Sequence, residues 1–182
     1  TLTAEEKPAT EEKPATEEKP TTEEKPNMLE CESNRFTSKG LINRIYRFVR
    51  NFSIDQKKKL IANNTGQKNG NMLDVGSGTG HFAAAMQKAG WEVTGLEPDE
   101  GARAVACKEH SLNLLPSVEL FNLPENKFNA ITLWHVLEHV HDVKKYIETF
   151  KKLLADNGKL FIAVPNYTSY DAESYKEYWA AY

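Results

Sequence analysis

The sequence has few cysteines, since Cys31 and Cys107 are the only two in 182 residues, too few for a disulfide framework or a zinc site. It lacks an apolar run long enough for a membrane span, and its N-terminus lacks a hydrophobic signal core. It also lacks a charge excess, because the formal net charge is −3. We therefore expect a cytoplasmic setting with reduced thiols, and no nucleic-acid or membrane partner.

From residue 3 to residue 26 the chain has no apolar side chain larger than alanine. This segment consists of four hexads, TAEEKP, ATEEKP, ATEEKP and TTEEKP. Such a segment cannot bury enough surface to offset its ordering entropy, and a proline in every hexad prevents a continuous helix. We expect residues 1–26 to be a disordered tail or an added segment, residues 27–39 a linker, and residues 40–182 the folded domain.

The most informative stretch that is present runs from Met72 to Phe82 and reads MLDVGSGTGHF. Its first four residues predict a buried strand. Three glycines follow, Gly76, Gly78 and Gly80, and a helical pattern then continues until Gly90 ends it. Glycine is needed where the backbone takes a positive φ or lies directly against a ligand. Strand, glycine turn and helix together indicate the start of a nucleotide-binding α/β unit.

The spacing of the glycines narrows the choice of cofactor. A dinucleotide fingerprint is G-x-G-x-x-G, whereas here the third glycine comes one residue early and His81 follows it. Asp74 also lies two positions before the first glycine. This pattern resembles the acidic-x-G-x-G-x-G signature of class I S-adenosylmethionine-dependent methyltransferases. A tight strand–helix turn without a ligand is the alternative.

The rest of the domain alternates predicted helices and strands. We expect helices at residues 40–52 and at 55–63, the latter with Ser53 as its N-cap, and later helices that begin after Asp99 and Asp142. This order predicts an α/β fold, a Rossmann-like doubly wound parallel sheet with helices on both faces and a ligand at the carboxyl ends of the strands. The five expected strands cover residues 72–75, 91–96, 112–115, 128–134 and 159–164.

The first expected helix is amphipathic and carries three arginines, Arg44, Arg47 and Arg50, on one face. We interpret this face as solvated, and contact with an acidic or phosphorylated substrate is the alternative. Another charged candidate, Glu97, ends the second expected strand. A carboxylate there can accept hydrogen bonds from both ribose hydroxyls, and an ordinary surface acid is the alternative.

The resemblance to class I methyltransferases extends from about Gly40 to Pro165 and includes LDVGSGTGHF, GLEPD, FNAITLWHVLEHVHD and GKLFIAVPN. The Leu-Glu-His-Val block resembles the branch that contains the ubiquinone-pathway O-methyltransferases. It implies S-adenosylmethionine as cofactor and methyl transfer to an unidentified, small-molecule acceptor. The cofactor-binding residues that it implies are Asp74, Gly76, Ser77, Gly78, Gly80, Phe82, Glu97, Pro98, Ser117, Val118 and Trp134, with the adenine near Ser117 and Val118.

His135 is the candidate catalytic base, because imidazole titrates near neutral pH, and packing at a strand end is the alternative. In the quinone-type relatives an acidic residue followed by Glu and His can hold a divalent cation. The corresponding residues here are His135, Glu138 and His139. Because the first of them is not acidic, we assign no metal ligands.

Two other functions stay open: an NAD-dependent oxidoreductase, which would need the missing later glycine, and a cofactor-binding protein without catalysis. The family sheet also has seven strands, and residues 167–182 hold no alternating apolar run of strand length. We therefore expect the C-terminal antiparallel strands to be missing and the edge of the fifth strand to be exposed. Such an edge predicts self-association, together with weak or absent turnover.

Overall fold

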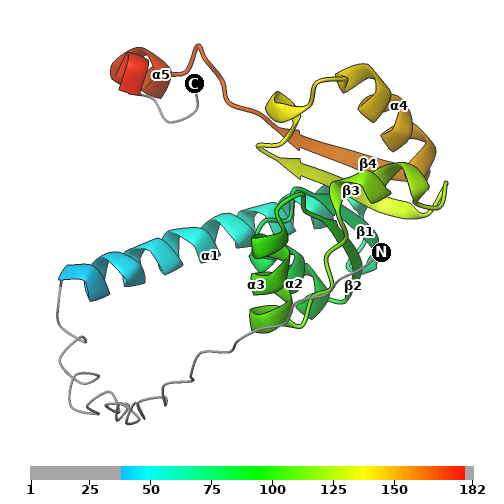
Figure 1. Ribbon diagram of the computed structural model, residues 1–182, viewed down its shortest axis with the longest axis horizontal. Helices are drawn as coiled ribbons and strands as arrows, with labels where there is room; N and C mark the ends of the chain where they lie inside the picture. Colours follow the sequence, from blue (N-terminus) through cyan, green and yellow to red (C-terminus); the bar gives the residue numbers. More distant parts are fainter. Residues whose placement is uncertain (1–37, 179–182) are drawn as a thin grey trace, which may run out of the picture. The chain divides into compact units, whose positions relative to one another are not determined.

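The computed structural model describes residues 38–178, so the predictions for the repeat at 1–26 and for residues 27–37 lie outside the described residues. The chain divides into two units, Thr1–Asn43 and Arg44–Tyr182, and the sheet belongs to the second. Four parallel strands are arranged in the order β2-β1-β3-β4 (Figure 1). These strands are β1 (Gly70–Val75), β2 (Trp91–Leu96), β3 (Phe128–Trp134) and β4 (Leu154–Ala163).

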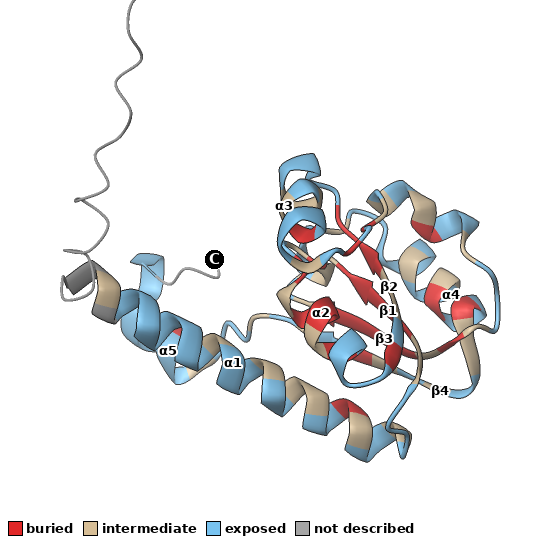
Figure 2. Cartoon of the chain, turned by 90° about the horizontal axis from the view of Figure 1, so that it is seen from below, coloured by how far each residue is buried: buried red, intermediate tan, exposed pale blue. Residues whose placement is uncertain are grey.

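Helices cover both faces of the sheet. Met72 and Leu73 are neighbours in β1 and point to opposite faces, as successive strand residues do. Met72 packs in one apolar cluster with residues of α1 and α2, and Leu73 packs in another with residues of η2 and α4. Figure 2 shows that the buried residues concentrate in β1, β2 and β3. The helices are α1 (Ser38–Thr65), α2 (His81–Lys88), α3 (Glu100–His110), η2 (Ser117–Asn122), η3 (Leu137–His139), α4 (Val143–Leu153), α5 (Tyr170–Tyr175) and η4 (Lys176–Tyr178).

The prediction of two helices before β1 was wrong, because α1 is continuous from Ser38 to Thr65. No glycine or proline occurs between Leu41 and Thr65 to interrupt the backbone hydrogen bonds. Ser53 therefore lies inside a helix and caps none. The continuity of α1 matters for the site, since residues on both sides of Ser53 face the same cavity.

The expected third strand at 112–115 is reduced to a single parallel bridge between Leu115 and Leu96. The Leu115 N–H donates to the Gly95 carbonyl at 2.9 Å, and the Glu97 N–H donates to the Leu115 carbonyl at 2.9 Å. Pro116 follows at once and has no N–H with which to continue the ladder. Within residues 38–178 the sheet therefore has four strands instead of the expected five.

The last strand begins earlier than the sequence pattern indicated. β4 starts at Leu154, directly after α4, and Asn157 takes a positive φ of 64° inside it. The pairing register with β3 shifts between Phe128 and Ala130, so the strand is irregular where Asn157 and Gly158 lie. From β4 to residue 178 the described chain forms α5 and η4 and no further strand. None of the helices between residues 38 and 178 has the length and hydropathy that a membrane crossing requires.

Candidate cofactor-binding site

The turn after β1 depends on its glycines, which take positive φ values of 75° at Gly76, 54° at Gly78 and 80° at Gly80. A Cβ on Gly76 would overlap the Val136 side chain, and a Cβ on Gly80 would lie 2.9 Å from the Ala106 Cβ. A Cβ on Gly78 would meet no atom within 4 Å. Packing therefore requires two of the glycines, while Gly78 borders open space where a ligand can reach the backbone.

A cavity of about 420 Å³ opens beside this turn, at the carboxyl ends of β1 and β3. Its size lies within the ~300–1,000 Å³ that small-molecule sites occupy. The turn, α2, the end of β3 and one side of α1 all contribute to its wall. The lining residues are Tyr46, Val49, Arg50, Ser53, Ile54, Lys57, Asp74, Gly76, Ser77, Gly78, Thr79, His81, Phe82 and Trp134.

Asp74 lies almost fully buried near the end of β1, where it accepts a 2.7 Å hydrogen bond from the Thr132 hydroxyl of β3. Burial raises the pKa of Asp74 from 3.8 to about 6, because removal from water disfavours the carboxylate. The hydrogen bond from Thr132 and the charge of Lys57 act in the opposite direction. Asp74 thus joins two central strands beneath the glycine turn. Its raised pKa lies about one unit below neutral pH.

Lys57 brings a cation from α1 to the same cavity. Its Nζ lies 4.5 Å from the centre of the Trp134 ring and 5.6 Å from that of Phe82. The two rings meet edge to face, with centroids 5.7 Å apart. Burial lowers the pKa of Lys57, and the nearby Asp74 carboxylate raises it in part. Lys57, Asp74 and the two rings therefore all line the cavity, and the Lys57 ammonium lies within the distance at which a cation is attracted to an aromatic ring.

Sequence reasoning assigned no role to Lys57, although a signal was present. Lys57 lies three residues after Ile54 and four before Ile61, a spacing that places it on the buried side of α1. Arg50 lies four residues before Ile54 and also lines the cavity, so the interpretation of this arginine as part of a solvated face was wrong. Arg44 and Arg47, by contrast, are exposed.

Glu97 is buried at the end of β2 and contacts the turn directly. Its Oε2 accepts a 2.7 Å hydrogen bond from the Gly78 N–H, and its Oε1 accepts one of 3.0 Å from the Asp99 N–H. The Asp99 side chain caps α3 by accepting the Ala102 N–H at 2.6 Å. Each Glu97 oxygen can accept one more hydrogen bond, and a vicinal diol has two hydroxyl groups that can donate.

The cavity gathers part of the expected residue set. Asp74, Gly76, Ser77, Gly78, Phe82 and Trp134 line it, whereas Glu97 does not line it and is hydrogen-bonded to a residue that does, Gly78. Gly80, Pro98, Ser117, Val118 and His135 do not line it. Pro98 and Val118 are exposed after β2 and at the start of η2.

His135 follows β3 with a positive φ of 58°, and its backbone N–H donates to the Ala163 carbonyl at 2.9 Å. Its exposed ring lies 3.7 Å from the Glu138 carboxylate, measured from Nδ1 to Oε1. Among residues 38–178, His135, Glu138 and His139 do not converge as a metal-ligand group. The group of potential ligands that does converge is His81, Glu109 and His110.

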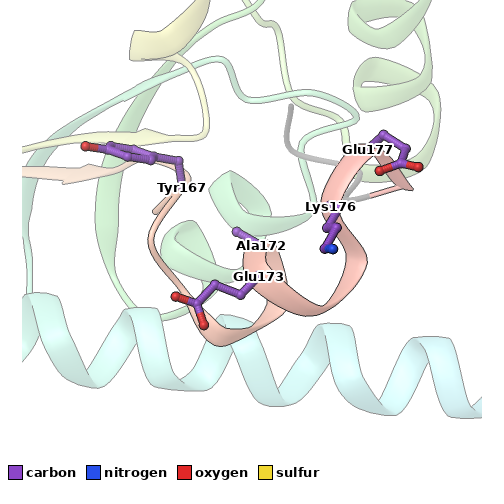
Figure 3. A pocket seen from close by; sticks show the side chains of 5 residues that line it. All are labelled: Tyr167, Ala172, Glu173, Lys176 and Glu177. Atoms are coloured by element: carbon purple, nitrogen blue, oxygen red, sulfur yellow. The ribbon is translucent and has the colours of Figure 1, made fainter.

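A larger cavity, of about 830 Å³, lies away from the glycine turn. Figure 3 shows the five side chains that line it, which all come from the stretch between Tyr167 and Glu177. None of the expected cofactor-binding residues belongs to this stretch. We therefore place the candidate site at the smaller cavity.

Known proteins resemble the same part of the chain. A family model described as "Methyltransferase domain" matches residues 45–182. The ubiquinone biosynthesis O-methyltransferase of Coxiella burnetii is 32% identical over 105 residues, which cover 54% of this chain and 45% of the relative. The protein of the same name from Actinobacillus pleuropneumoniae is 38% identical over 109 residues, 53% of this chain and 46% of the relative. This chain thus matches about half the length of these relatives.

A solved structure shares the fold. The SAM-dependent methyltransferase from Leishmania major aligns with a TM-score of 0.56 at 21% identity, over 70% of this chain and 56% of the other. The parallel α/β sheet agrees with this likeness. Because the family match covers most of the chain, including the glycine turn, this chain belongs to the methyltransferase-domain family, among the class I S-adenosylmethionine-dependent methyltransferases.

Proposed function

We propose that this chain binds S-adenosylmethionine in the 420 Å³ cavity and transfers the methyl group to a small-molecule acceptor. The observation that carries the proposal is the position of Gly78, which borders open space while its N–H binds the buried Glu97 carboxylate. This arrangement combines close backbone access with an acceptor for a ribose diol. It provides no glycine for the pyrophosphate of a dinucleotide.

The residues around the cavity fit the groups of this cofactor. Glu97 would hold the ribose hydroxyls, Gly76 and Ser77 would lie along the methionine part, and the adenine would lie toward Pro98, Ser117 and Val118. The indole N–H of Trp134 is buried at the cavity and has no hydrogen-bond partner among the described residues.

The cofactor supplies a methyl group on a positively charged sulfur, and the leaving thioether is neutral and needs no acid. The protein therefore has to align the acceptor with the methyl group, which contributes up to about 7–11 kcal/mol. For a hydroxyl or amine acceptor we propose His135 as the general base. The Glu138 carboxylate beside its ring would stabilise the protonated imidazole.

Two titrations separate this proposal from its alternatives. In isothermal titration calorimetry the chain should bind S-adenosylhomocysteine and give no heat with NAD. Binding of NAD without a response to S-adenosylhomocysteine would indicate an oxidoreductase. Methyl transfer from labelled S-adenosylmethionine to a panel of phenols, amines and acids then tests catalysis. Binding without transfer to any acceptor would indicate a cofactor-binding protein.

We propose further that the chain works in the cytoplasm without a nucleic-acid or membrane partner, and that it self-associates through β4. β4 is the last strand in the sheet order, and the exposed Ile162 and Val164 lie at its end. A strand edge without a partner offers N–H and C=O groups for pairing. Sedimentation velocity over a range of concentrations tests this, and a constant monomer mass would exclude it.

A further inference from the structure

Three helices are joined by one chain of hydrogen bonds at the rim of the cavity. The Arg50 Nη1 of α1 lies 2.8 Å from the His81 Nε2 at the start of α2. The other ring nitrogen of His81, Nδ1, lies 3.0 Å from the His110 Nε2 at the end of α3. The two imidazole rings meet edge to face, with centroids 4.6 Å apart. Neither histidine has a role in the site described above.

The chemistry of arginine determines which atom donates and which accepts in these two hydrogen bonds. A guanidinium only donates hydrogen bonds, so the His81 Nε2 must accept and therefore carries no proton. The proton of neutral His81 is then on Nδ1 and is donated to the His110 Nε2. His110 in turn carries its proton on Nδ1. This is the only pair of tautomers that satisfies both contacts.

The Arg50 side chain lines the cavity, and part of its guanidinium has no hydrogen-bond partner among the described residues. It lines the wall together with Gly78 and Lys57. Its Nε is buried without a hydrogen-bond partner among the described residues, and no described carboxylate forms an ion pair with it. A guanidinium held in one orientation with free donors suits a carboxylate ligand. The amino-acid part of the proposed cofactor carries such a group.

We propose that His110 and His81 are positioning residues, which hold the Arg50 guanidinium at the cavity so that its free donors meet the carboxylate of the cofactor. This inference rests on the proposed function. His110 touches neither the cavity nor the cofactor, and acts through His81. The same geometry argues against a metal ion among His81, Glu109 and His110. A metal on the His81 Nδ1 would leave the proton on Nε2, facing the donor of Arg50.

We call the two hydrogen bonds that join His110, His81 and Arg50 the relay. The relay is intact only while both imidazoles are neutral. A proton on the His110 Nε2 would face the Nδ1–H of His81, and moving that proton to the His81 Nε2 would face Arg50. The charged groups nearby are Arg50, Asp55 and Lys58 on α1, Lys88 on α2, and Glu109 on α3. Burial, Arg50 and His110 lower the pKa of His81, and Glu109 raises it in part. These influences keep His81 neutral near pH 7, so the relay should fail as the pH falls below the ordinary histidine range.

Calorimetry with S-adenosylhomocysteine tests the relay in the full chain. His110→Ala should weaken binding about fivefold at neutral pH, the effect of one hydrogen bond. His110→Gln retains an acceptor for the His81 N–H and should restore part of the affinity. In an Arg50→Ala background, His110→Ala should cause no further change. His141→Ala, at an exposed histidine, is the matched control and should bind as the parent chain does.

Two results would overturn the inference. The first is equal affinity of the parent chain and His110→Ala, with both folded by circular dichroism. The second is a nitrogen-15 spectrum that shows the Nε2–H tautomer for His81 at neutral pH. The tautomer readout requires no cofactor. The protein could thus bind no S-adenosylhomocysteine and yet show Nδ1–H in both rings. That result would overturn the proposed function and the role of Arg50 in cofactor binding, and the hydrogen bonds of the relay would stand.

Discussion

The Gly78 N–H and the Glu97 carboxylate form a 2.7 Å hydrogen bond that joins the glycine turn to the end of β2. The same carboxylate holds the Asp99 N–H at the start of α3. One buried side chain thus orients the turn and the following helix, and each of its oxygens can accept a further hydrogen bond. Because we also propose Glu97 as the acceptor for the ribose hydroxyls, we expect a substitution there to have two measurable consequences.

Glu97→Ala should weaken S-adenosylhomocysteine binding roughly 10- to 100-fold, because hydrogen bonds to a charged group contribute about 1.5–3 kcal/mol. It should also lower the free energy of unfolding by about 1–3 kcal/mol, since two N–H groups lose their acceptor. Calorimetry and urea denaturation measure the two effects. Glu97→Gln keeps one carbonyl oxygen and should lie between. Unchanged affinity in the alanine variant would show that Glu97 does not bind the ribose.

Asp74 should make stability depend on pH. Its pKa is raised to about 6 in the folded chain, so the folded state favours the protonated acid. This contribution is fully present below the unfolded pKa of 3.8 and is lost as the pH rises through about 6, a loss of roughly 2–3 kcal/mol. Asp74→Asn keeps an acceptor for Thr132 and should remove this dependence. Urea denaturation at several pH values measures it, with Asp156→Asn at an exposed site as control.

Lys57 should lower the pKa of the Asp74 carboxyl group. Its ammonium lowers the pKa of Asp74, so Lys57→Met should raise that pKa above the value of about 6. Carbon-13 titration of the Asp74 carboxyl measures the change directly. Lys58→Met is the matched control, because Lys58 pairs with Asp55 instead. A titration that is identical in the parent chain and in Lys57→Met would show that the two groups do not interact.

The sequence predicted those parts of the fold that depend on local signals. β2 and β3 have the expected bounds, and Asp99 and Asp142 cap the helices that follow them. Apolar runs and N-caps act over a few residues and are visible in the sequence. The expected third strand does not form, because Leu112 and Leu114 pack with residues of α2 and α3 and because Pro116 ends the pairing at Leu115. That outcome depends on tertiary contacts.

The lining of the cavity was predictable from the sequence where neighbouring residues in the chain form it. Gly76, Gly78 and Asp74 are close to one another in sequence, and the turn brings them together. The sequence did not place Lys57 and Arg50 at the cavity, because their position depends on which side of α1 faces the sheet. The relay from His110 to Arg50 joins residues 60 positions apart in the numbering, and no local pattern links them.

Removal of residues 1–26 should leave the melting temperature and the affinity for S-adenosylhomocysteine unchanged. The four hexads contain no apolar side chain larger than alanine that could dock on the domain. Differential scanning calorimetry and titration of the shortened chain measure both quantities. The deletion removes about four negative charges, so both should be compared at two salt concentrations. A large fall in either quantity would indicate that the repeat is ordered against the domain.

Gly80→Ala and Gly78→Ala should separate packing from ligand access. Both residues have a positive φ, so both variants carry a similar backbone strain of about 1 kcal/mol. At Gly80 the new methyl group would also press on the Ala106 Cβ at 2.9 Å and on a Leu112 methyl at 3.0 Å. Overpacking costs a further 1–3 kcal/mol or so, and this variant should lose the more stability.

At Gly78 the new methyl group meets open space within the folded chain but faces the cavity. Gly78→Ala should therefore unfold at a temperature closer to that of the parent chain and lose more cofactor affinity than its stability change explains. Thermal melts and calorimetry on the two variants give the comparison. If Gly78→Ala bound S-adenosylhomocysteine as tightly as the parent chain, the cofactor could not lie against this glycine, and the cavity beside the turn would not be its site.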